Sequence, residues 1–182
     1  MENGSEHEQQ KVYTPYKELT LETLTALPDD ELENVIFDYI FGKITNARDD
    51  EMRLEIILSM SSGFQMIWFT HNLLIRVLHG GFNEFFYGGS SEVTQMTLKY
   101  MKMIGATEYL EIFEQAIDAH RKEMQNPIMQ ELYSEQTLHG YSESFRISSL
   151  KEFDNKFVEL GLRLRKLKTQ YIRSNPHLFV GI

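Results

Sequence analysis

The sequence of 182 residues contains no cysteine and only four prolines. Without cysteine the chain can form no disulfide scaffold, no thiolate nucleophile and no cysteine-ligated zinc site. The few prolines, together with 11 glycines, leave little room for long irregular loops. A chain of this length falls within the roughly 100–200 residues of one ordinary domain, and it can fold without a covalent or metal staple.

The sequence also lacks an apolar run pure enough to cross a membrane. The longest uncharged stretch lies between Glu55 and Arg76, and it contains three serines, a glutamine, a threonine, a histidine and an asparagine. Because a bilayer span needs about 20 predominantly apolar residues, we interpret this stretch as a buried central helix. The first ten residues are polar and acidic, without the apolar segment of a signal peptide. We therefore expect a cytoplasmic protein with no membrane partner.

Negative charge exceeds positive charge, and the excess is uneven along the chain. The 27 acidic residues outnumber the 18 lysines and arginines, which gives a net charge of −9. Residues 1–60 carry −9 and residues 61–145 carry −5, whereas residues 146–182 carry +5. Direct binding to a nucleic-acid backbone requires clustered cations, so this balance disfavours it and permits a basic protein partner instead. We interpret the basic run Arg163–Lys168 as the solvated face of an amphipathic helix.

Apolar side chains recur with helical spacing along most of the chain. The segment after Pro28 begins with carboxylates in its first turn, and Phe37 and Phe41 lie on a second face, which predicts a helix packed on two sides. Its main apolar stripe is Leu32, Val35, Ile36, Tyr39 and Ile40. Further helices are expected over 49–60, over the central stretch up to Gly80–Gly81, from Ser90 to Met103, and over 107–124.

The C-terminal third predicts a long helix after an irregular segment. Residues 125–145 are polar with scattered aromatics and are expected to form a loop or irregular hairpin. Ser149 and Glu152 have the spacing of a capping box. An apolar stripe then predicts a helix of roughly 36 Å that Gly161 bends and that ends at Asn175–Pro176. The stripe is Leu150, Phe153, Phe157, Leu160, Leu164, Leu167 and Tyr171.

These patterns together predict an all-α protein, a multi-helix bundle with a long C-terminal helix. Residues 1–13 are expected to be frayed and residues 14–182 to form a single all-helical domain. No strand series and no internal repeat interrupts the helical pattern.

The sequence carries no motif of a known catalytic or cofactor site. Its six histidines form neither H-x-x-H nor H-E-x-x-H, so no pair of imidazoles faces a metal from one helix. The sequence contains no nucleophile elbow and no phosphate-binding loop, and its glycine pairs lack dinucleotide spacing. We therefore expect no catalytic residue, no metal and no cofactor.

Surface acidity is the remaining functional signal. Helix 107–124 places apolar residues on one face and three carboxylates, those of Glu111, Glu114 and Asp118, on the opposite face. These carboxylates are separated along the axis by roughly 4.5 and 6 Å, which approaches the charge spacing along a DNA strand. A second candidate cluster is Asp29, Asp30, Glu31 and Glu33. The alternative is that both groups simply face water.

Several sequence segments resemble one known family. The run from His79 to Phe86, which contains Gly80-Gly81-Phe82 and the pair Phe85-Phe86, resembles the signature of a bacterial family of unknown function whose best-known type is a DNA-mimic protein. Supporting segments are Met103–Ala106, Phe153-Asp154 with Phe157, and Tyr171–Pro176 with Phe179. The resemblance covers roughly residues 35–179, and it departs from the family at His79, where an asparagine is expected.

The resemblance implies an all-helical, often dimeric protein whose acidic face occupies the DNA-binding surface of a transcription factor. Our leading hypothesis is accordingly a non-enzymatic interaction protein that binds a basic DNA-binding protein. A second hypothesis is a small-ligand or enzymatic site lined by the aromatic turn near His79. A third is an oligomerisation module, which uses the Leu150–Tyr171 stripe to form a homodimer.

The glycine–phenylalanine motif also has a purely structural interpretation. Gly80 and Gly81 permit a backbone turn with positive φ, and Phe82, Phe85 and Phe86 would then fill the core beneath that turn.

Overall fold

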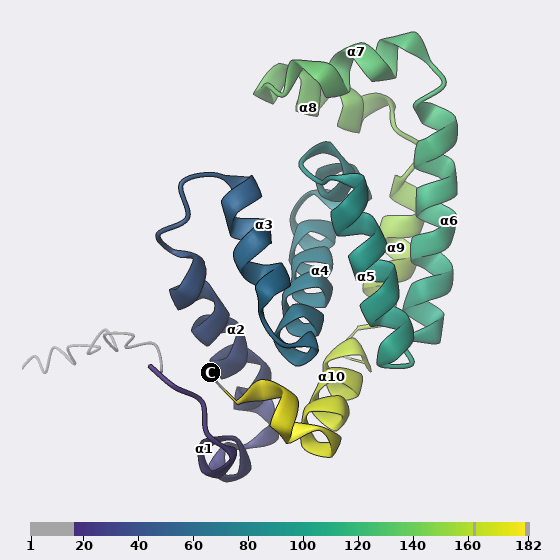
Figure 1. Ribbon diagram of the computed structural model, residues 1–182. Helices are drawn as coiled ribbons and strands as arrows, with labels where there is room; N and C mark the ends of the chain where they lie inside the picture. The colour runs from purple at the N-terminus through teal and green to yellow at the C-terminus, as the bar shows by residue number, and fades with distance from the viewer. Residues whose placement is uncertain (1–16, 162, 181–182) are drawn as a thin grey trace, which may run out of the picture.

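Helix α4 (Ser62–Tyr87) runs through the middle of the molecule, and other helices pack around it (Figure 1). The computed structural model describes residues 17–161 and 163–180, and in these ranges it contains ten α-helices, one short 3-10 helix and no strand. The other elements are α1 (Leu21–Ala26), α2 (Asp29–Ile44), α3 (Asp50–Ser59), α5 (Ser91–Met103), α6 (Thr107–Glu123), α7 (Pro127–Glu135), α8 (Leu138–Ile147), α9 (Lys151–Glu159), α10 (Arg163–Ser174) and η1 (Pro176–Phe179).

The all-α prediction and the C-terminal helix are confirmed, and the described helices form a single compact domain. The predicted boundary between residues 13 and 14 lies outside the described residues. Side-chain caps explain where several helices begin: a side-chain oxygen of Asp49, Ser90 or Thr137 accepts a hydrogen bond from a backbone N–H in the first turn. Such a cap contributes about 1 kcal/mol to helix stability.

An aromatic cluster forms the core between α4, α6 and α9. Phe82 and Phe85 are fully buried, and the Phe82 ring centroid lies 5.9 Å from that of Phe113 and 5.3 Å from that of Phe157. Phe86, also buried, stacks on the His120 ring at a centroid distance of 4.3 Å. Burial lowers the pKa of His120, which favours the neutral form of the ring.

A sharp kink at Gly80–Gly81 places this aromatic cluster. Gly81 has φ 70° and ψ −173°, a region that only glycine occupies readily. The backbone N–H of Phe82 then donates a 2.7 Å hydrogen bond to Asp154 Oδ1 of α9. The glycines interrupt the central helix as expected, but Phe82–Tyr87 continue as a helical segment instead of the predicted turn.

Residues 125–145 are not an irregular loop, and this expectation was wrong. Asn126 caps α7, Pro127 occupies its first turn, and Thr137 caps α8. A buried polar contact fixes the pair to α4: Tyr133 donates to Asn83 Oδ1 at 3.0 Å, and Asn83 Nδ2 donates to the Ser144 hydroxyl at 3.2 Å. The two helices have only nine and ten residues, so each offers too few turns for a helical period to stand out in the sequence.

The C-terminal stripe does not form one continuous helix. Gly161, at φ 60°, separates α9 from α10, and its carbonyl accepts a 2.7 Å hydrogen bond from the Tyr109 hydroxyl. The expected capping box is also wrong, because the α9 N-cap is Leu150, and Ser149 instead donates to the Glu123 carboxylate. Every side chain of the stripe is buried or packed against the core. The stripe is therefore not available as the interface that the oligomerisation hypothesis requires.

Two glycine substitutions test the kink. A Cβ at position 81 would collide with the Asp154 carboxylate, whereas a Cβ at Gly161 meets nothing within 4 Å. We expect Gly81→Ala to lower the free energy of unfolding by roughly 3 kcal/mol, and Gly161→Ala by about 1 kcal/mol, the cost of a left-handed alanine. Urea denaturation measures both changes. Equal losses in the two variants would contradict a specific role for the kink.

Candidate protein interface

The acidic stripe predicted on helix 107–124 lies on the exposed face of α6. Its opposite face is fixed by Tyr109 and Phe113, both fully buried. Three carboxylates of α6 make exposed ion pairs: Glu114 with Lys102 of α5 at 3.3 Å, Asp118 with Arg121 at 2.7 Å, and Glu108 with Arg163 of α10 at 2.8 Å. Glu111 takes part in none of the ion pairs found within residues 17–161 and 163–180.

These ion pairs leave the carboxylates of α6 available to a partner. An exposed ion pair contributes only about 0–1 kcal/mol to the stability of the fold, because water and salt screen both charges. The lysines and arginines of a binding partner can therefore replace the intramolecular cations at little cost.

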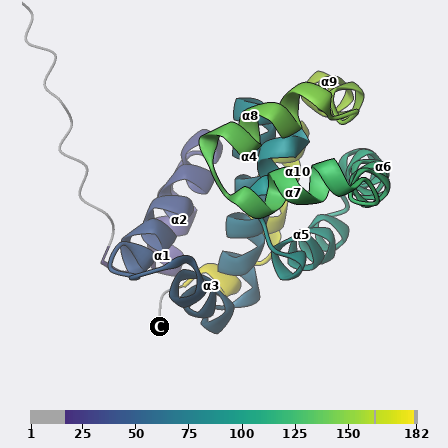
Figure 2. The ribbon, with the colours of Figure 1, turned by 90° about the horizontal axis from the view of Figure 1, so that it is seen from above.

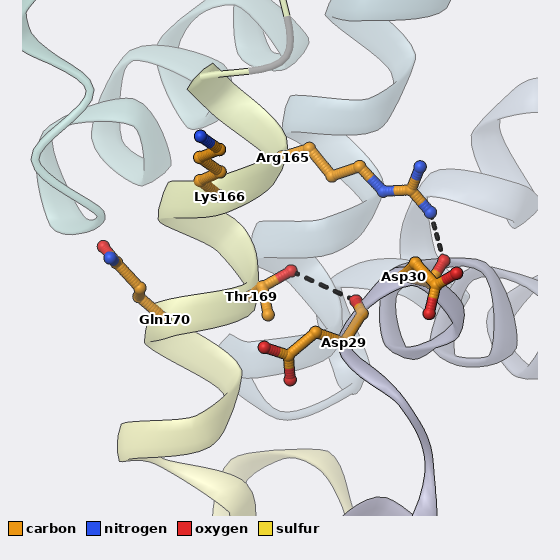
Figure 3. Close-up of a pocket in the computed structure, with 6 residues that line it drawn as sticks. All are labelled: Asp29, Asp30, Arg165, Lys166, Thr169 and Gln170. Carbon is orange, nitrogen blue, oxygen red and sulfur yellow. Dashed lines mark hydrogen bonds between the residues drawn. The ribbon is translucent and has the colours of Figure 1, made fainter.

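The acidic cluster at the start of α2 lies directly against basic side chains of α10 (Figure 3). Arg173 Nε donates to the Asp29 carboxylate at 2.8 Å, and Arg165 reaches from α10 to the backbone carbonyl of Asp30. The shallow hollow between the helices has a volume of about 390 Å³ and contains as many cations as carboxylates. Glu31 is exposed. This cluster is therefore partly neutralised by the chain itself.

Glu33 does not belong to any exposed face, which corrects the expectation that it does. Its side chain is buried, forms an ion pair with Lys168 Nζ of α10, and lies 3.0 Å from His71 Nδ1 of α4. Lys168 is fully buried as well, so the expectation of a solvated basic face on α10 is wrong at this position. Burial alone would raise the pKa of Glu33, but the His71 hydrogen bond and the Lys168 charge outweigh it and hold the pKa below its ordinary value.

The two acidic groups do not form one continuous surface. In Figures 1 and 2, α2 and α6 lie on opposite sides of α4. A partner that binds the α6 stripe through one flat surface therefore does not also contact Asp29–Glu31.

His79 and the aromatic residues that follow it lie in different environments. His79 itself is exposed, whereas Phe82, Phe85 and Phe86 point into the core. Within the described part of the chain, no group of three or more histidine, aspartate or glutamate side chains is placed to hold a metal ion. Among the same residues, none of the helices has the length and apolar character that a bilayer crossing requires.

Comparison with protein-family models matches residues 59–175 to DMP19-like protein, a DNA-mimic family. The match covers nearly two thirds of the sequence. The chain belongs to the DMP19-like family. No curated protein and no solved structure matches it. The matched region of this DMP19-like chain runs from the end of α3 to the end of α10, so it includes the α6 stripe and Lys168 but not the cluster at Asp29–Glu31.

The structure also contains a groove that the sequence patterns did not reveal. It lies between α2, α3, α4 and the start of α5, and its volume is about 610 Å³. Phe41, expected to pack inside, is 56% exposed and forms part of its wall. The carboxylates of Asp50, Glu51 and Glu92 also line the groove. The sequence analysis expected a helix over 49–60 but did not single out Asp50 or Glu51.

The buried contact of Glu33 makes a pH-dependent prediction. Removing one partner of a buried ion pair leaves an uncompensated charge, so Glu33→Gln should lower the free energy of unfolding by about 3–5 kcal/mol near neutral pH. Because the folded-state pKa is depressed, this contribution is present above the ordinary value of 4.5 and is lost as pH falls through the lower folded value. Urea titrations across that range should show the gap to wild type narrowing in acid.

The matched control for this prediction is Glu31→Gln, on the same helix but exposed. It should change the free energy of unfolding by less than about 0.5 kcal/mol. A Glu33→Gln loss that stays constant with pH would show that the carboxylate charge is not what stabilises the site.

Proposed function

We propose that this DMP19-like chain is a non-enzymatic bacterial protein that mimics DNA. In this proposal the acidic stripe of α6 binds the basic DNA-binding surface of a transcription factor in the cytoplasm. The observation that carries the proposal is the exposed row of Glu111, Glu114 and Asp118 on one straight helix of the family-matched region. No direct contact with nucleic acid is part of this function, because the stripe would repel phosphates.

The spacing of the stripe supports this role. A helical rise of 1.5 Å separates the three carboxylates by roughly 4.5 and 6 Å along the axis. A DNA strand places its phosphates about 3.4 Å apart along the duplex axis, so the carboxylate steps lie between the rise of one phosphate and that of two.

The rigidity of α6 supports the same role. Phe113 and Ala116 are fully buried on the inner face of the helix, and Tyr109 joins it to the α9–α10 junction. The carboxylates are therefore held on a fixed backbone before the partner arrives. Preorganisation of this kind lowers the entropic cost of binding.

The family resemblance also suggests a homodimer, which would present two copies of the stripe. In this proposal the dimer contact does not involve Leu150–Tyr171, since those apolar side chains are packed within the chain. A mass measurement in solution distinguishes a dimer from a monomer.

A triple substitution tests the stripe. We expect Glu111→Gln, Glu114→Gln and Asp118→Asn together to weaken the complex with a purified partner by roughly tenfold or more, because three favourable charge contacts are removed. The complex with the variant should also depend less steeply on salt. The partner is first captured from bacterial lysate at low salt, released at high salt and displaced by duplex DNA, and affinities are then measured by calorimetry.

The matched control neutralises three exposed carboxylates that lie outside both α6 and the groove, namely Glu18→Gln, Glu22→Gln and Glu131→Gln. It changes the net charge by the same amount but leaves α6 intact, so it should change partner affinity much less. A variant with Asp29, Asp30 and Glu31 neutralised tests the second cluster. If neither the α6 nor the α2 variant changes the affinity, the acidic-surface proposal is wrong.

A further inference from the structure

The groove beside α3 has the features of a peptide-binding site. Helices α2 and α4 provide apolar walls through Phe41, Ile44 and Trp68, and α3 adds Leu54. Its volume of about 610 Å³ lies within the range of roughly 300–1,000 Å³ typical of ligand sites. Phe41 is more than half exposed, although a large aromatic side chain gains free energy when it is covered.

We propose that this groove binds a short peptide segment of a partner protein, in which an apolar anchor is flanked by lysines or arginines. The proposal goes beyond DNA mimicry, because the groove is a different surface from the α6 stripe and takes a different kind of ligand.

Charge complementarity identifies the flanking residues of the peptide. Glu51 and Glu92 line the groove from α3 and α5, and Asp50 lies beside them in an ion pair with Arg53. With Arg53 and Arg76 included, the lining carries three carboxylates and two guanidiniums, so negative charge is in excess. Glu55 continues the acidic surface along α3 and is exposed. A peptide with cations on either side of its apolar anchor places those cations against these carboxylates, whereas an acidic peptide would be repelled.

Polar groups of α4 match the main chain of such a peptide. Asn72 lies in the groove with an amide that both donates and accepts hydrogen bonds, the two functions of a peptide backbone. Arg76 also lines the groove, where its Nη1 donates to the Glu84 carbonyl at 3.3 Å. A guanidinium carries five N–H donors, so others can donate to a peptide carbonyl. Gly88 and Gly89 form the neighbouring wall, and the absence of a side chain at Gly88 lets the Arg76 guanidinium lie directly against it.

The single tryptophan of the chain reports on this groove directly. Trp68 lines the wall and stacks on Phe37 at a centroid distance of 5.6 Å. A peptide that covers Phe41 excludes water near the indole. Its binding should therefore shift the wavelength of Trp68 emission and change its intensity.

The experiment titrates the full chain with a synthetic acetylated and amidated peptide, Arg-Arg-Leu-Phe-Arg-Arg, by tryptophan fluorescence and calorimetry. Two comparison peptides keep the length: one replaces the arginines by glutamates, and the other replaces Leu-Phe by Ser-Ser. We expect saturable binding of the first peptide, no binding of the acidic one, and binding of the Ser-Ser peptide weakened roughly tenfold, since its anchor is lost.

Two variants separate the groove from the α6 stripe. Glu51→Lys with Glu92→Lys should weaken the arginine peptide roughly tenfold or more, because two attractive contacts become repulsive. Glu111→Lys with Asp118→Lys makes the same change of net charge on α6 and should weaken peptide binding much less, because the apolar anchor of the peptide lies in the groove and not on the stripe. Circular dichroism confirms that both variants are folded.

Three results would overturn the proposal. They are no saturable binding of the arginine peptide, equal binding of the acidic peptide, or equal weakening by the α3–α5 and α6 variants. Because the groove and the stripe are changed in different variants, failure of this proposal leaves the DNA-mimic proposal separately testable.

Discussion

The buried ion pair between Lys168 and Glu33 constrains the rest of the structure. It joins α10 to α2 across 135 positions of sequence, and His71 of α4 completes the contact. Two charges removed from water are stable only when they meet each other in good geometry. The pair therefore favours the register of α10 against α2 in which these two charges meet. The Phe37 ring, stacked on His71 at 3.9 Å, closes the site from the other side.

This register decides where the positive charge of the C-terminal segment goes. Lys168 lies inside, Arg165 and Arg173 face the start of α2, and Arg163 pairs with Glu108. Cations that would repel a basic partner are thus held against the chain's own acidic groups. Exposed carboxylates remain on α3 and along α6, which are the two surfaces proposed to bind basic partners.

A second constraint positions α6 relative to the centre. The backbone turn at Gly81 directs Phe82 toward Phe113 and Phe157, and the same turn lets Asp154 accept a hydrogen bond from the Phe82 N–H. Helices α4, α6 and α9 therefore share one aromatic core. The acidic stripe depends on this core, because only a helix anchored on its inner face presents a fixed row of charges on its outer face.

Local patterns in the sequence were enough to determine the helical class, the starts of α2, α3, α5 and α6, and the exposure of Glu111, Glu114 and Asp118. Helical periodicity and caps act over only a few residues, which is why these features are visible in the sequence. The same patterns misplaced Glu33, Lys168 and Phe41, and they did not reveal the groove. Whether a carboxylate on α2 faces water or a lysine 135 residues away depends on how the helices pack against each other. Periodicity within one helix does not predict that packing. Tertiary packing alone decided which charges are buried, which are compensated and which remain free to meet a partner.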